Sequence, residues 1–471
     1  MIVWNHSKII ATVGPASESK KELLLMLRAG ADVFRINGAH GDFDQYNRII
    51  DRVREVGKKE KFPPAIMIDL PGPKYRLGKI KNDSMMLHKG RQIILSCKHT
   101  KQIDDTIPVP CALHKMLKKN DKVYINDGLV CLIVRSVKST HVECEVACAG
   151  EIRSGKGINL PNLSVDVPAM TPRDKEILDF AVESEVEYVC MSFVRHAKDL
   201  QILKNLIKRK TPYLKLIAKI EKPEALEEID NIIDVADAVM VARGDLGIEI
   251  PFARLPIVQK EILKRCMIAG KPSIVATQML ESMVNSKRPT RAEATDVAEA
   301  VWGGADALML SEETTIGIDP ANAVAAMVSI AYEAEGEMPP PQQMRRELDQ
   351  NNLQAQVLAE AAVLIAEELG ACAIVAPTRS GRTPLFVSRQ RPCVPILAPT
   401  SNEHVARSMN LCWGVIPMMM KEVETVDELL SQAEKAALHS GFIKKGDRIV
   451  IASGAHGAKD DVTKLVEVRV V

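Results

Sequence analysis

The feature that most constrains this chain is an alternation of short apolar runs with segments of helical periodicity. Eight apolar runs lie at residues 7–15, 32–40, 64–70, 187–193, 214–221, 238–245, 271–278 and 305–313. From Asn37 onward, the residues that close neighbouring runs stand 26 to 34 positions apart, except across one interruption. Eight units of this size predict a (β/α)8 barrel of the TIM type, an α/β fold with a closed parallel sheet.

Two regions depart from this repeat. Residues 71–156 contain short β-type runs and turns without an amphipathic helix, which predicts a small all-β, barrel-like domain inserted in the barrel. The string GEMPPPQQ ends the barrel, and strands alternate with helices after it, which predicts an open α/β domain. We therefore expect a catalytic barrel at 1–70 and 157–335, an all-β lid at 71–156, and a C-terminal α/β domain at 345–471.

Charge, hydropathy and cysteine usage exclude several classes of partner. Lys and Arg total 62 against 61 for Asp and Glu, so a net charge of +1 gives no reason to expect nucleic acid or an anionic membrane. No run reaches the roughly eighteen apolar residues that span a bilayer, and no signal peptide is evident. The ten cysteines form no CxxC pair, and Cys144 and Cys148 are expected buried on one face of a strand. These features predict a cytoplasmic protein.

Polar side chains close the apolar runs, at the strand ends where barrel enzymes carry their functional groups. They are Arg35, Asn37, Asp69, Lys219, Glu221, Arg243, Asp245, Thr277, Gln278, Ser311 and Glu313. Charged groups closing such apolar strands are costly to desolvate unless they pair with each other, a metal or a charged substrate.

Four of these residues indicate a chemistry. Lys219 and Glu221 alternate on one strand and so point to the same face, while Asp245 closes the next strand. Two carboxylates with substrate oxygens make a site of the kind that Mg²⁺ takes. Lys219 and Arg35 would hold a phosphate and stabilise negative charge as it moves, as phosphoryl transfer requires. The alternative is a structural ion-pair cluster that fills the barrel mouth.

Three other motifs need interpretation. The string GEIRSGKG nearly matches a phosphate-binding loop, but Gly157 stands where the metal-binding hydroxyl belongs, and the string ends the β-insert. His40 is interpreted as a nucleotide contact, with a catalytic base as the alternative. In TRSGRT, between a strand and a helix, Thr378, Ser380, Gly381 and Thr383 suit an effector phosphate, with a capped polar turn as the alternative.

Five long strings carry a resemblance to a known family. They are KIIATVGPAS at 8–17, IAKIEKPEAL at 217–226, MVARGDLGIEIP at 240–251, ATQMLESM at 276–283 and RPTRAEATDVAEAV at 288–301. They resemble characteristic segments of the pyruvate kinase family, and the likeness covers the whole chain. The resemblance implies transfer of the phosphoryl group of phosphoenolpyruvate to ADP in glycolysis, giving pyruvate and ATP, with Mg²⁺ as cofactor and Mn²⁺ as a substitute.

The resemblance also implies roles for single residues. Glu221 and Asp245 would be the Mg²⁺ ligands, and Lys219 would stabilise the transferring phosphoryl group and the enolate. Arg35 would contact phosphate, and Thr277 would belong to the route that protonates the enolate carbon. The backbone amides of Arg243, Gly244 and Asp245 would bind the substrate carboxylate, and Asn37, His40 and Arg76 would lie near the nucleotide. A homotetramer with allosteric coupling, and a C-terminal domain for regulation and oligomerisation, are implied as well.

Two strings depart from the family pattern. Most members read NFSHG and DTKGPEIR where this chain reads NGAHG and DLPGPKYR, and in those members Asn, Ser, Asp and Thr oxygens bind K⁺. Asn37 and Asp69 remain as a residual monovalent-cation site, Ala39 removes one oxygen, and Lys74 replaces a Glu. Because a Lys ammonium is a fixed charge of suitable size, we hypothesise K⁺-independent activity through Lys74. A solvated Lys74 beside a weakened K⁺ site is the alternative.

Smaller departures leave other points open. His196 stands where some relatives carry a Lys near the nucleotide, and Glu312 interrupts the family's SGET. The loop 453–460 lacks the Trp and Arg of a fructose bisphosphate pocket, which leaves the effector unidentified. Two rival functions are a different phosphoenolpyruvate-using barrel enzyme and a catalytically inactive sensing or assembly protein.

Overall fold

The computed structural model confirms the predicted fold class. It describes residues 4–60, 63–97, 105–109, 113–126, 128–161, 168–338, 352–454 and 463–471. Eight parallel strands close into a barrel in the order β1-β17-β16-β15-β14-β13-β3-β2. Their bounds are β1 Lys8–Thr12, β2 Val33–Asn37, β3 Ala65–Leu70, β13 Tyr188–Met191, β14 Lys215–Ile220, β15 Ala238–Ala242, β16 Ser273–Ala276 and β17 Ala307–Leu310. All eight predicted apolar runs contain one of these strands.

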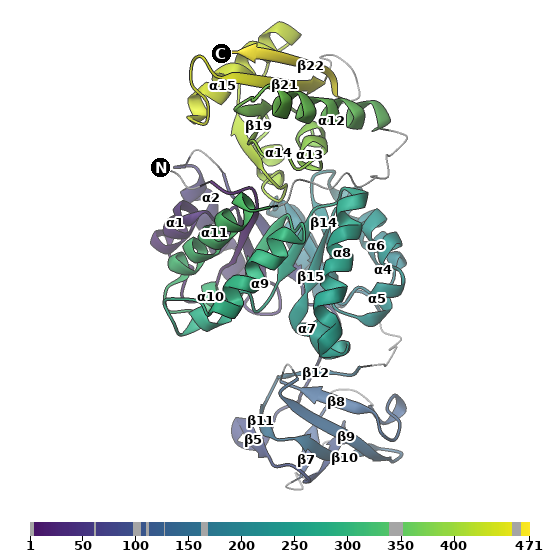
Figure 1. Cartoon of the computed structure of the whole chain (residues 1–471). Helices are drawn as coiled ribbons and strands as arrows, with labels where there is room; N and C mark the ends of the chain where they lie inside the picture. The colour runs from purple at the N-terminus through teal and green to yellow at the C-terminus, as the bar shows by residue number, and fades with distance from the viewer. Residues whose placement is uncertain are drawn as a thin grey trace.

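Helices surround the barrel, as the alternation predicts (Figure 1). They are α1 Lys20–Ala29, α2 Phe43–Gly57, α3 Pro172–Glu183, α4 Ala197–Lys210, α5 Pro223–Glu227, α6 Ile229–Val235, α7 Arg243–Glu249, α8 Leu255–Ala269, α9 Arg291–Trp302, α10 Glu312–Thr315 and α11 Pro320–Gly336. Caps fix where several begin: the Ser19 side chain accepts from the Glu22 N–H, and Thr171 with Asp174 forms a capping box.

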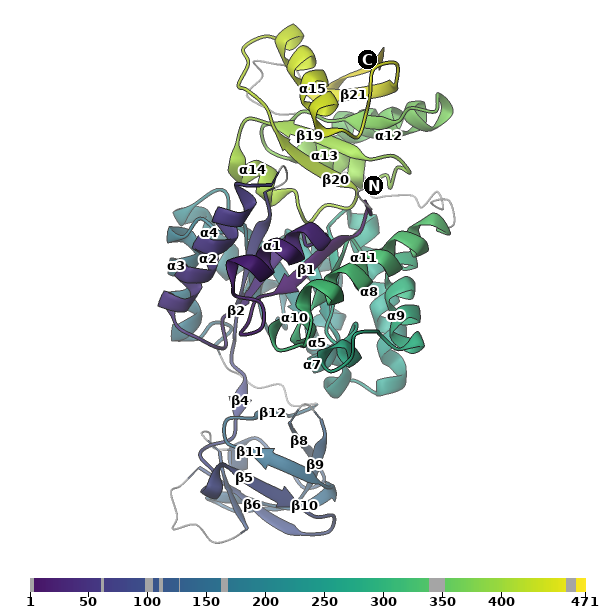
Figure 2. The ribbon, with the colours of Figure 1, turned by 90° about the vertical axis from the view of Figure 1, so that its left-hand side faces the viewer.

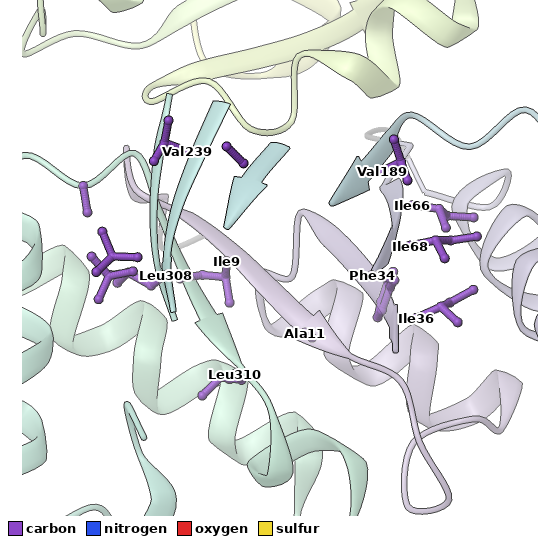
Figure 3. Close-up of a cluster of buried hydrophobic side chains, with 14 of the residues drawn as sticks. Ile9, Ala11, Phe34, Ile36, Ile66, Ile68, Val189, Val239, Leu308 and Leu310 are labelled. Carbon is purple, nitrogen blue, oxygen red and sulfur yellow. The ribbon is translucent and has the colours of Figure 1, made fainter. Parts of the chain in front are cut away.

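The barrel strands are apolar on both faces because each face is covered. Ile9, Phe34, Ile66 and Leu308 pack with apolar helix residues in a large outer core, and Figure 3 shows such side chains on the strands. The alternate residues, among them Ile10, fill the barrel interior. Burial on both faces explains why the sequence shows continuous apolar runs here in place of strict alternation.

The inserted region is all β, as predicted. Its strands are β4 Tyr75–Arg76, β5 Ser84–Leu87, β6 Gln92–Ser96, β7 Thr106–Pro108, β8 Lys122–Ile125, β9 Val130–Val137, β10 His141–Cys148, β11 Gly150–Arg153 and β12 Gly157–Asn159. They form a seven-stranded sheet, β4-β12-β8-β9-β10-β6-β7, and a two-stranded sheet, β11-β5. Strand β12 lies past the expected end of the insertion at 156, yet it pairs with β4 and β8 in the same sheet.

One sequence expectation within the insertion is wrong. Cys144 is fully buried, but Cys148 is exposed. A β-bulge between Val146 and Cys148 shifts the register of β10 by one residue, which moves Cys148 to the opposite face of the sheet.

The C-terminal region is an open α/β sheet, as predicted, with strand order β20-β19-β18-β21-β22. Its elements are α12 Leu353–Glu368, β18 Ala373–Val375, α13 Arg382–Ser388, β19 Ile396–Thr400, α14 Glu403–Ser408, β20 Val415–Met419, α15 Val426–Ser440, β21 Arg448–Gly454 and β22 Thr463–Val470. The antiparallel strand β22 was not anticipated. The expected start of this domain at residue 345 lies outside the described residues.

The C-terminal region docks where the barrel strands begin. Glu187, fully buried just before β13, lies 2.8 Å from Arg54 Nη2 and 2.7 Å from Arg407 Nε. The Tyr188 hydroxyl donates to the Ser408 carbonyl at 2.6 Å, and Arg391 Nη2 lies 3.0 Å from Asp306 Oδ1. Figures 1 and 2 show the three parts in a row, with the β-insertion at the far end of the barrel from this junction. Within the described ranges, no helix combines the length and apolarity needed to cross a membrane.

Candidate active site

The carboxyl ends of the barrel strands bring a buried cation and two carboxylates together. Lys219, near the end of β14, places its ammonium 2.9 Å from Glu221 Oε1 and 3.1 Å from Asp69 Oδ2. The same ammonium donates to the Ser192 hydroxyl at 2.9 Å. Burial opposes charge on Lys219, but Asp69 and Glu221 outweigh it and raise its pKa. Lys219 is therefore a permanent cation at the barrel mouth.

Arg35 and Asp69 complete this cluster from β2 and β3. Arg35 Nη2 lies 2.8 Å from Asp69 Oδ2, and Nη1 donates to the Thr12 hydroxyl at 3.1 Å. Burial alone would raise the pKa of Asp69, but Arg35 and Lys219 hold that pKa well below its usual range. Arg35 Nε and Asp69 Oδ1 are buried and meet no hydrogen-bond partner among the described residues. The cluster therefore retains one donor and one acceptor for a further group.

Glu221 is held by a strained backbone. Its Oε2 accepts from the Phe193 N–H at 2.7 Å, and Phe193 adopts a φ of 55°, in the left-handed region that bulky residues rarely occupy. Burial raises the pKa of Glu221, Lys219 lowers it, and the negative charge of Asp245 raises it again. The two carboxylates therefore lie close enough to repel each other, which favours a cation between them.

Asp245, in the first turn of α7, contacts the inserted domain. Its Oδ1 lies 2.7 Å from Lys74 Nζ and accepts from Asn159 Nδ2 at 3.2 Å. Burial opposes charge on Asp245, but Lys74 and Asn159 outweigh it and lower its pKa. Asn159 Nδ2 also donates to Glu249 Oε1 at 3.3 Å, and Lys222 Nζ lies 2.7 Å from that oxygen. This network joins the insertion to the barrel.

Lys74 is thus placed on a barrel carboxylate. Its side chain is 18% exposed, so the solvated position considered as an alternative is wrong for this structure. Asn37 and Asp69, the residual monovalent-cation residues, face each other as register partners on β2 and β3. Asn37 Oδ1 accepts from the Ala39 N–H at 3.1 Å.

Thr277 lies beside the start of α7. Its φ is 72°, a strained value for a β-branched residue, and its hydroxyl accepts from the Gly244 N–H at 2.7 Å. The Arg243 side chain fixes the backbone of this turn. Its Nη2 donates to the Thr277 carbonyl at 2.7 Å, and its Nη1 donates to Asp296 Oδ2 at 2.6 Å. Gly244 and Thr277 were both expected to act on the donor substrate, and the structure places them in direct contact.

The residues expected near the nucleotide gather at the base of the insertion. Burial lowers the pKa of His40, and the nearby charges of Arg76 and Arg35 lower it further. Arg76 Nη1 also donates to the Gly155 carbonyl at 3.1 Å. A small cleft of about 50 Å³ opens between the insertion and the barrel, and Asn37, His40 and Arg76 are not among the residues that line it. It is lined by Pro73, Lys74, Tyr75, Ile158, Asn159, Leu160, Phe193, Arg195, Lys222, Glu224 and Glu249.

The remaining candidates lie elsewhere or in local roles. His196 Nδ1 lies 2.9 Å from Glu228 Oε1, and Glu312 is exposed at the start of α10. The string GEIRSGKG runs from β11 into β12 without a helix, so it has no phosphate-loop architecture.

The TRSGRT turn precedes α13, in the C-terminal region. The Thr378 hydroxyl accepts from the Gly381 N–H at 2.9 Å, and the Thr383 hydroxyl lies 3.0 Å from that of Thr463. The Ser380 hydroxyl accepts from the Arg382 N–H at 3.4 Å. These bonds form a polar turn, but the residue before α13 is Gly381, which provides no side-chain cap, and phosphate binding stays a prediction. Most of the loop 453–460 lies outside the described residues.

Three site residues were missed. Asn159 joins Asp245 to Glu249, Ser192 accepts from Lys219, and Phe193 holds Glu221 through its backbone. Ser192 is a polar residue that follows an apolar barrel strand, so the strand-end criterion applied to Arg35 and Asp69 would have found it. Asn159 ends β12 in the sheet of the insertion, where that criterion does not apply. A contact made by a backbone N–H, as at Phe193, leaves no such signal.

Comparison with known proteins finds similar proteins over nearly the whole chain. The family model "Pyruvate kinase, barrel domain" matches residues 4–324, and "Pyruvate kinase, alpha/beta domain" matches residues 356–469. Pyruvate kinase of Clostridium acetobutylicum is 39% identical over 99% of both chains. That of Thermococcus litoralis is 39% identical over 96% of this chain and 95% of its own. That of Geobacillus stearothermophilus is 37% identical over 99% of this chain and 80% of its own.

Proposed function

The chain belongs to the pyruvate kinase family, the phosphotransferases that use phosphoenolpyruvate as donor, and we propose that Lys219, Arg35 and Thr277 carry catalysis at its barrel mouth. The observation that carries the proposal is the buried ammonium of Lys219 between Asp69 and Glu221. A preorganised cation in a site of low polarity stabilises negative charge far better than one in water. Lys219 would stabilise the phosphoryl group in transit and the enolate that remains.

Arg35 would bind the phosphate of the donor. Two of its nitrogens orient the guanidinium on Asp69 and Thr12, and the buried Nε is left as a donor. An orientation fixed in this way costs no rearrangement during the reaction. Lys219 and Arg35 share Asp69, so the two cations are set side by side for one anion.

Glu221 and Asp245 fit a Mg²⁺ site. Both present hard carboxylate oxygens, they repel each other, and Mg²⁺ is usually held by one or two carboxylates with substrate oxygens. Within the described residues no three His, Cys, Asp or Glu side chains form a metal cluster, so this pair would depend on the substrate for further ligands. The metal would supply positive charge to the transferring phosphoryl group. Mn²⁺ takes similar oxygen ligands and would substitute.

The start of α7 would receive the substrate carboxylate. We propose the Gly244 and Asp245 amides as donors, because the first amides of a helix favour an anion. The Gly244 N–H donates to the Thr277 hydroxyl, so the substrate carboxylate would compete with that hydroxyl for this amide. The released hydroxyl would belong to the route that delivers a proton to the enolate carbon, giving pyruvate.

The nucleotide would lie against Asn37, His40 and Arg76. Burial and two arginines lower the pKa of His40, so its ring is neutral at physiological pH. His40 would therefore bind the nucleotide by hydrogen bonds. Arg76, on β4 at the start of the insertion, would contact a phosphate of the nucleotide. The region 71–156, extended by β12, would act as a lid that excludes water during transfer.

We also propose that activity does not require K⁺. Ala39 supplies no side-chain oxygen, and Lys74 carries a cation on the same side of the barrel, where it pairs with Asp245. In this proposal the Lys74 ammonium leaves Asp245 when the lid closes. It then occupies the monovalent-cation site beside Asn37 and Asp69. Rates measured in K⁺ and in tetramethylammonium at equal ionic strength should agree, and a clear increase in K⁺ would contradict the proposal.

Three broader proposals complete the function. The enzyme would act in the cytoplasm as a homotetramer, with the barrel at 1–70 and 157–335 for catalysis and the domain at 345–471 for regulation and assembly. TRSGRT would bind the phosphate of an effector, with Gly381, at a φ of 83°, permitting the turn.

Sedimentation velocity tests the assembly. Saturable activation by a phosphorylated metabolite, lost in Ser380→Ala, tests the effector site.

The central proposal is tested by ATP formation from phosphoenolpyruvate and ADP with Mg²⁺. Lys219→Met should lower kcat by at least about a hundredfold, as expected on loss of a preorganised charge. Lys215→Met, at the opposite end of the same strand, is the matched control and should stay close to wild type. Equal activity of the two variants would remove Lys219 from the mechanism.

A further inference from the structure

Two cysteines of the inserted domain occupy facing positions across neighbouring strands. Cys131 on β9 and Cys148 at the end of β10 are register partners in an antiparallel pair. The partnership depends on the bulge, because Val146 faces Leu132 and two residues of β10 then oppose one of β9. Among the described strands, no other two cysteines are paired in register.

The bulge also decides which face the thiols share. Val130, Leu132 and Val134 of β9 belong to the core of the insertion, so Cys131 points to the outer face of the sheet. Without the bulge Cys148 would follow Cys144 and Val146 into that core. Shifted by one residue, it joins Cys131 outside, where Cys131 is covered and Cys148 is exposed.

This arrangement satisfies the geometric requirement for a disulfide. Directly opposed residues in an antiparallel pair have Cα atoms about 4.5 or 5.5 Å apart, depending on their hydrogen-bonding class. Disulfides join Cα atoms about 4.4 to 6.8 Å apart, so closing the bond needs little backbone movement. Partners in register also project their side chains in the same direction.

We propose that Cys131 and Cys148 form a reversible redox site that small organic disulfides oxidise to a cross-strand disulfide. The Cys148 thiolate attacks one sulfur of the oxidant, whose S–S bond breaks and releases one thiolate that takes up a proton. Cys131 then loses its proton and attacks the Cys148 sulfur, which releases the second thiolate. The two protein thiols lose two electrons and two protons, and the oxidant is reduced to two thiols.

The order of attack follows from the surroundings of the two sulfurs. Burial raises the pKa of the Cys131 thiol, and Cys148 raises it further, while Lys122 and Tyr124 lower it. Cys131 is therefore a poor first nucleophile, and it lies too deep for a bulky oxidant. The exposed Cys148 reacts first, and Cys131 resolves the mixed disulfide from the adjacent strand.

The site lies near the contact of the insertion with the barrel. Cys131 is the second residue of β9, directly after the turn that includes Gly128. The backbone of Gly128 packs against Ile248 of α7, the helix whose first turn carries Asp245. A covalent link between β9 and β10 would stiffen the lid close to this contact.

Peptide mapping of the full chain after exposure to oxidised glutathione tests the proposal. Without reductant, the Cys131 and Cys148 peptides should appear linked, two hydrogen atoms lighter than their sum, and dithiothreitol should separate them. Alkylation should count two fewer free thiols per wild-type chain, a measurement that needs no variant. Cys131→Ser and Cys148→Ser should each abolish the link.

Cys144→Ser is the matched control, because Cys144 lies on β10 but is fully buried on the other face. This variant should retain the link. The proposal is wrong if Cys148 stays bound to glutathione while Cys131 remains reduced. It is also wrong if the oxidised wild-type chain keeps all its free thiols.

Discussion

The ammonium of Lys74 lies 2.7 Å from Asp245 Oδ1. Lys74 lies where the chain leaves β3 and enters the inserted domain. Its ammonium therefore contacts a carboxylate that we propose as a Mg²⁺ ligand. The two side chains are 18% and 21% exposed, so the pair is shielded from water on most sides. Any divalent cation that binds Asp245 has to compete with this internal charge.

Replacing Lys74 should therefore tighten metal binding. A partly buried ion pair contributes about 1 kcal/mol, which corresponds to roughly fivefold in affinity. We expect Lys74→Met to bind Mn²⁺ about fivefold more tightly than wild type without substrates, measured as free Mn²⁺ by electron paramagnetic resonance. Lys222→Met, which removes the partner of Glu249 in the same cleft, should change the affinity little. Unchanged Mn²⁺ binding in Lys74→Met would show that the pair does not restrain the site.

Two substitutions of Thr277 should show whether its hydroxyl takes part in the chemistry or its side chain only packs. Thr277→Val keeps the shape but removes the hydroxyl that accepts from the Gly244 N–H. We expect kcat to fall roughly a hundredfold, within the usual range for lost proton-transfer groups. Thr277→Ser keeps the hydroxyl and should retain most of the activity. Equal losses in the two variants would indicate that the methyl group matters and the hydroxyl does not.

The junction of the barrel with the C-terminal region should depend on Glu187. This buried carboxylate pairs with Arg54 and Arg407 and accepts from the Ile66 N–H at 2.8 Å. Glu187→Gln removes the buried counter-charge of Arg54 and leaves Arg407 paired with the exposed Glu403. This loss should cost about 3 kcal/mol and lower the urea midpoint. Glu403→Gln, which removes an exposed partner of the same Arg407, is the control and should leave the midpoint unchanged. A KM for phosphoenolpyruvate that shifts with Glu187→Gln would contradict a purely structural role.

Glu335 should contribute a defined part of the acid sensitivity. Burial opposes its charge, but contacts with the His6 ring and the His6 and Ser7 amides outweigh burial and lower its pKa. The unfolded chain, with a Glu pKa near 4.5, then takes up the proton first. Stability from the charged form is fully present above that value and is lost as pH falls through the lower folded pKa.

The comparison with Glu335→Gln isolates this contribution. Urea midpoints of wild type and variant should differ most at pH 7, and the difference should narrow by pH 4. Glu333→Gln, exposed on the same helix, should give no pH-dependent difference. A difference in urea midpoint that stays constant down to pH 4 would mean that the charge of Glu335 does not stabilise its contact with His6 and Ser7.

The barrel and the centre of the site could be predicted because local sequence determines them. Strands buried on both faces have to be apolar along their length, and the polar residue that ends each strand is therefore conspicuous. Alternation along one strand is enough to place Lys219 and Glu221 on the same face, and their ammonium and carboxylate lie 2.9 Å apart. Because β13 lies between β3 and β14, the order of strands in the sheet then brings Asp69 to the same cation.

Other features depend on geometry that sequence patterns do not encode. The partner of Lys74 is set by the hinge, where Gly72 takes a φ of 65°. The face of Cys148 depends on one extra residue in β10, because a slip of one position reverses every later side chain. The position of Glu221 depends on the backbone of Phe193, whose side-chain identity gives no hint of the bond.

Strand β13 spans the barrel between two kinds of contact. At its start, Glu187 and Tyr188 bind Arg407 and Ser408 of the C-terminal region, and two residues past its end the Phe193 N–H holds Glu221. The strand itself, Tyr188–Met191, spans about 10 Å at about 3.3 Å per residue, and a turn at Ser192 and Phe193 follows it. A displacement of this strand from the C-terminal side would reach the Glu221 carboxylate through the strand backbone, the turn at Ser192 and Phe193, and one hydrogen bond.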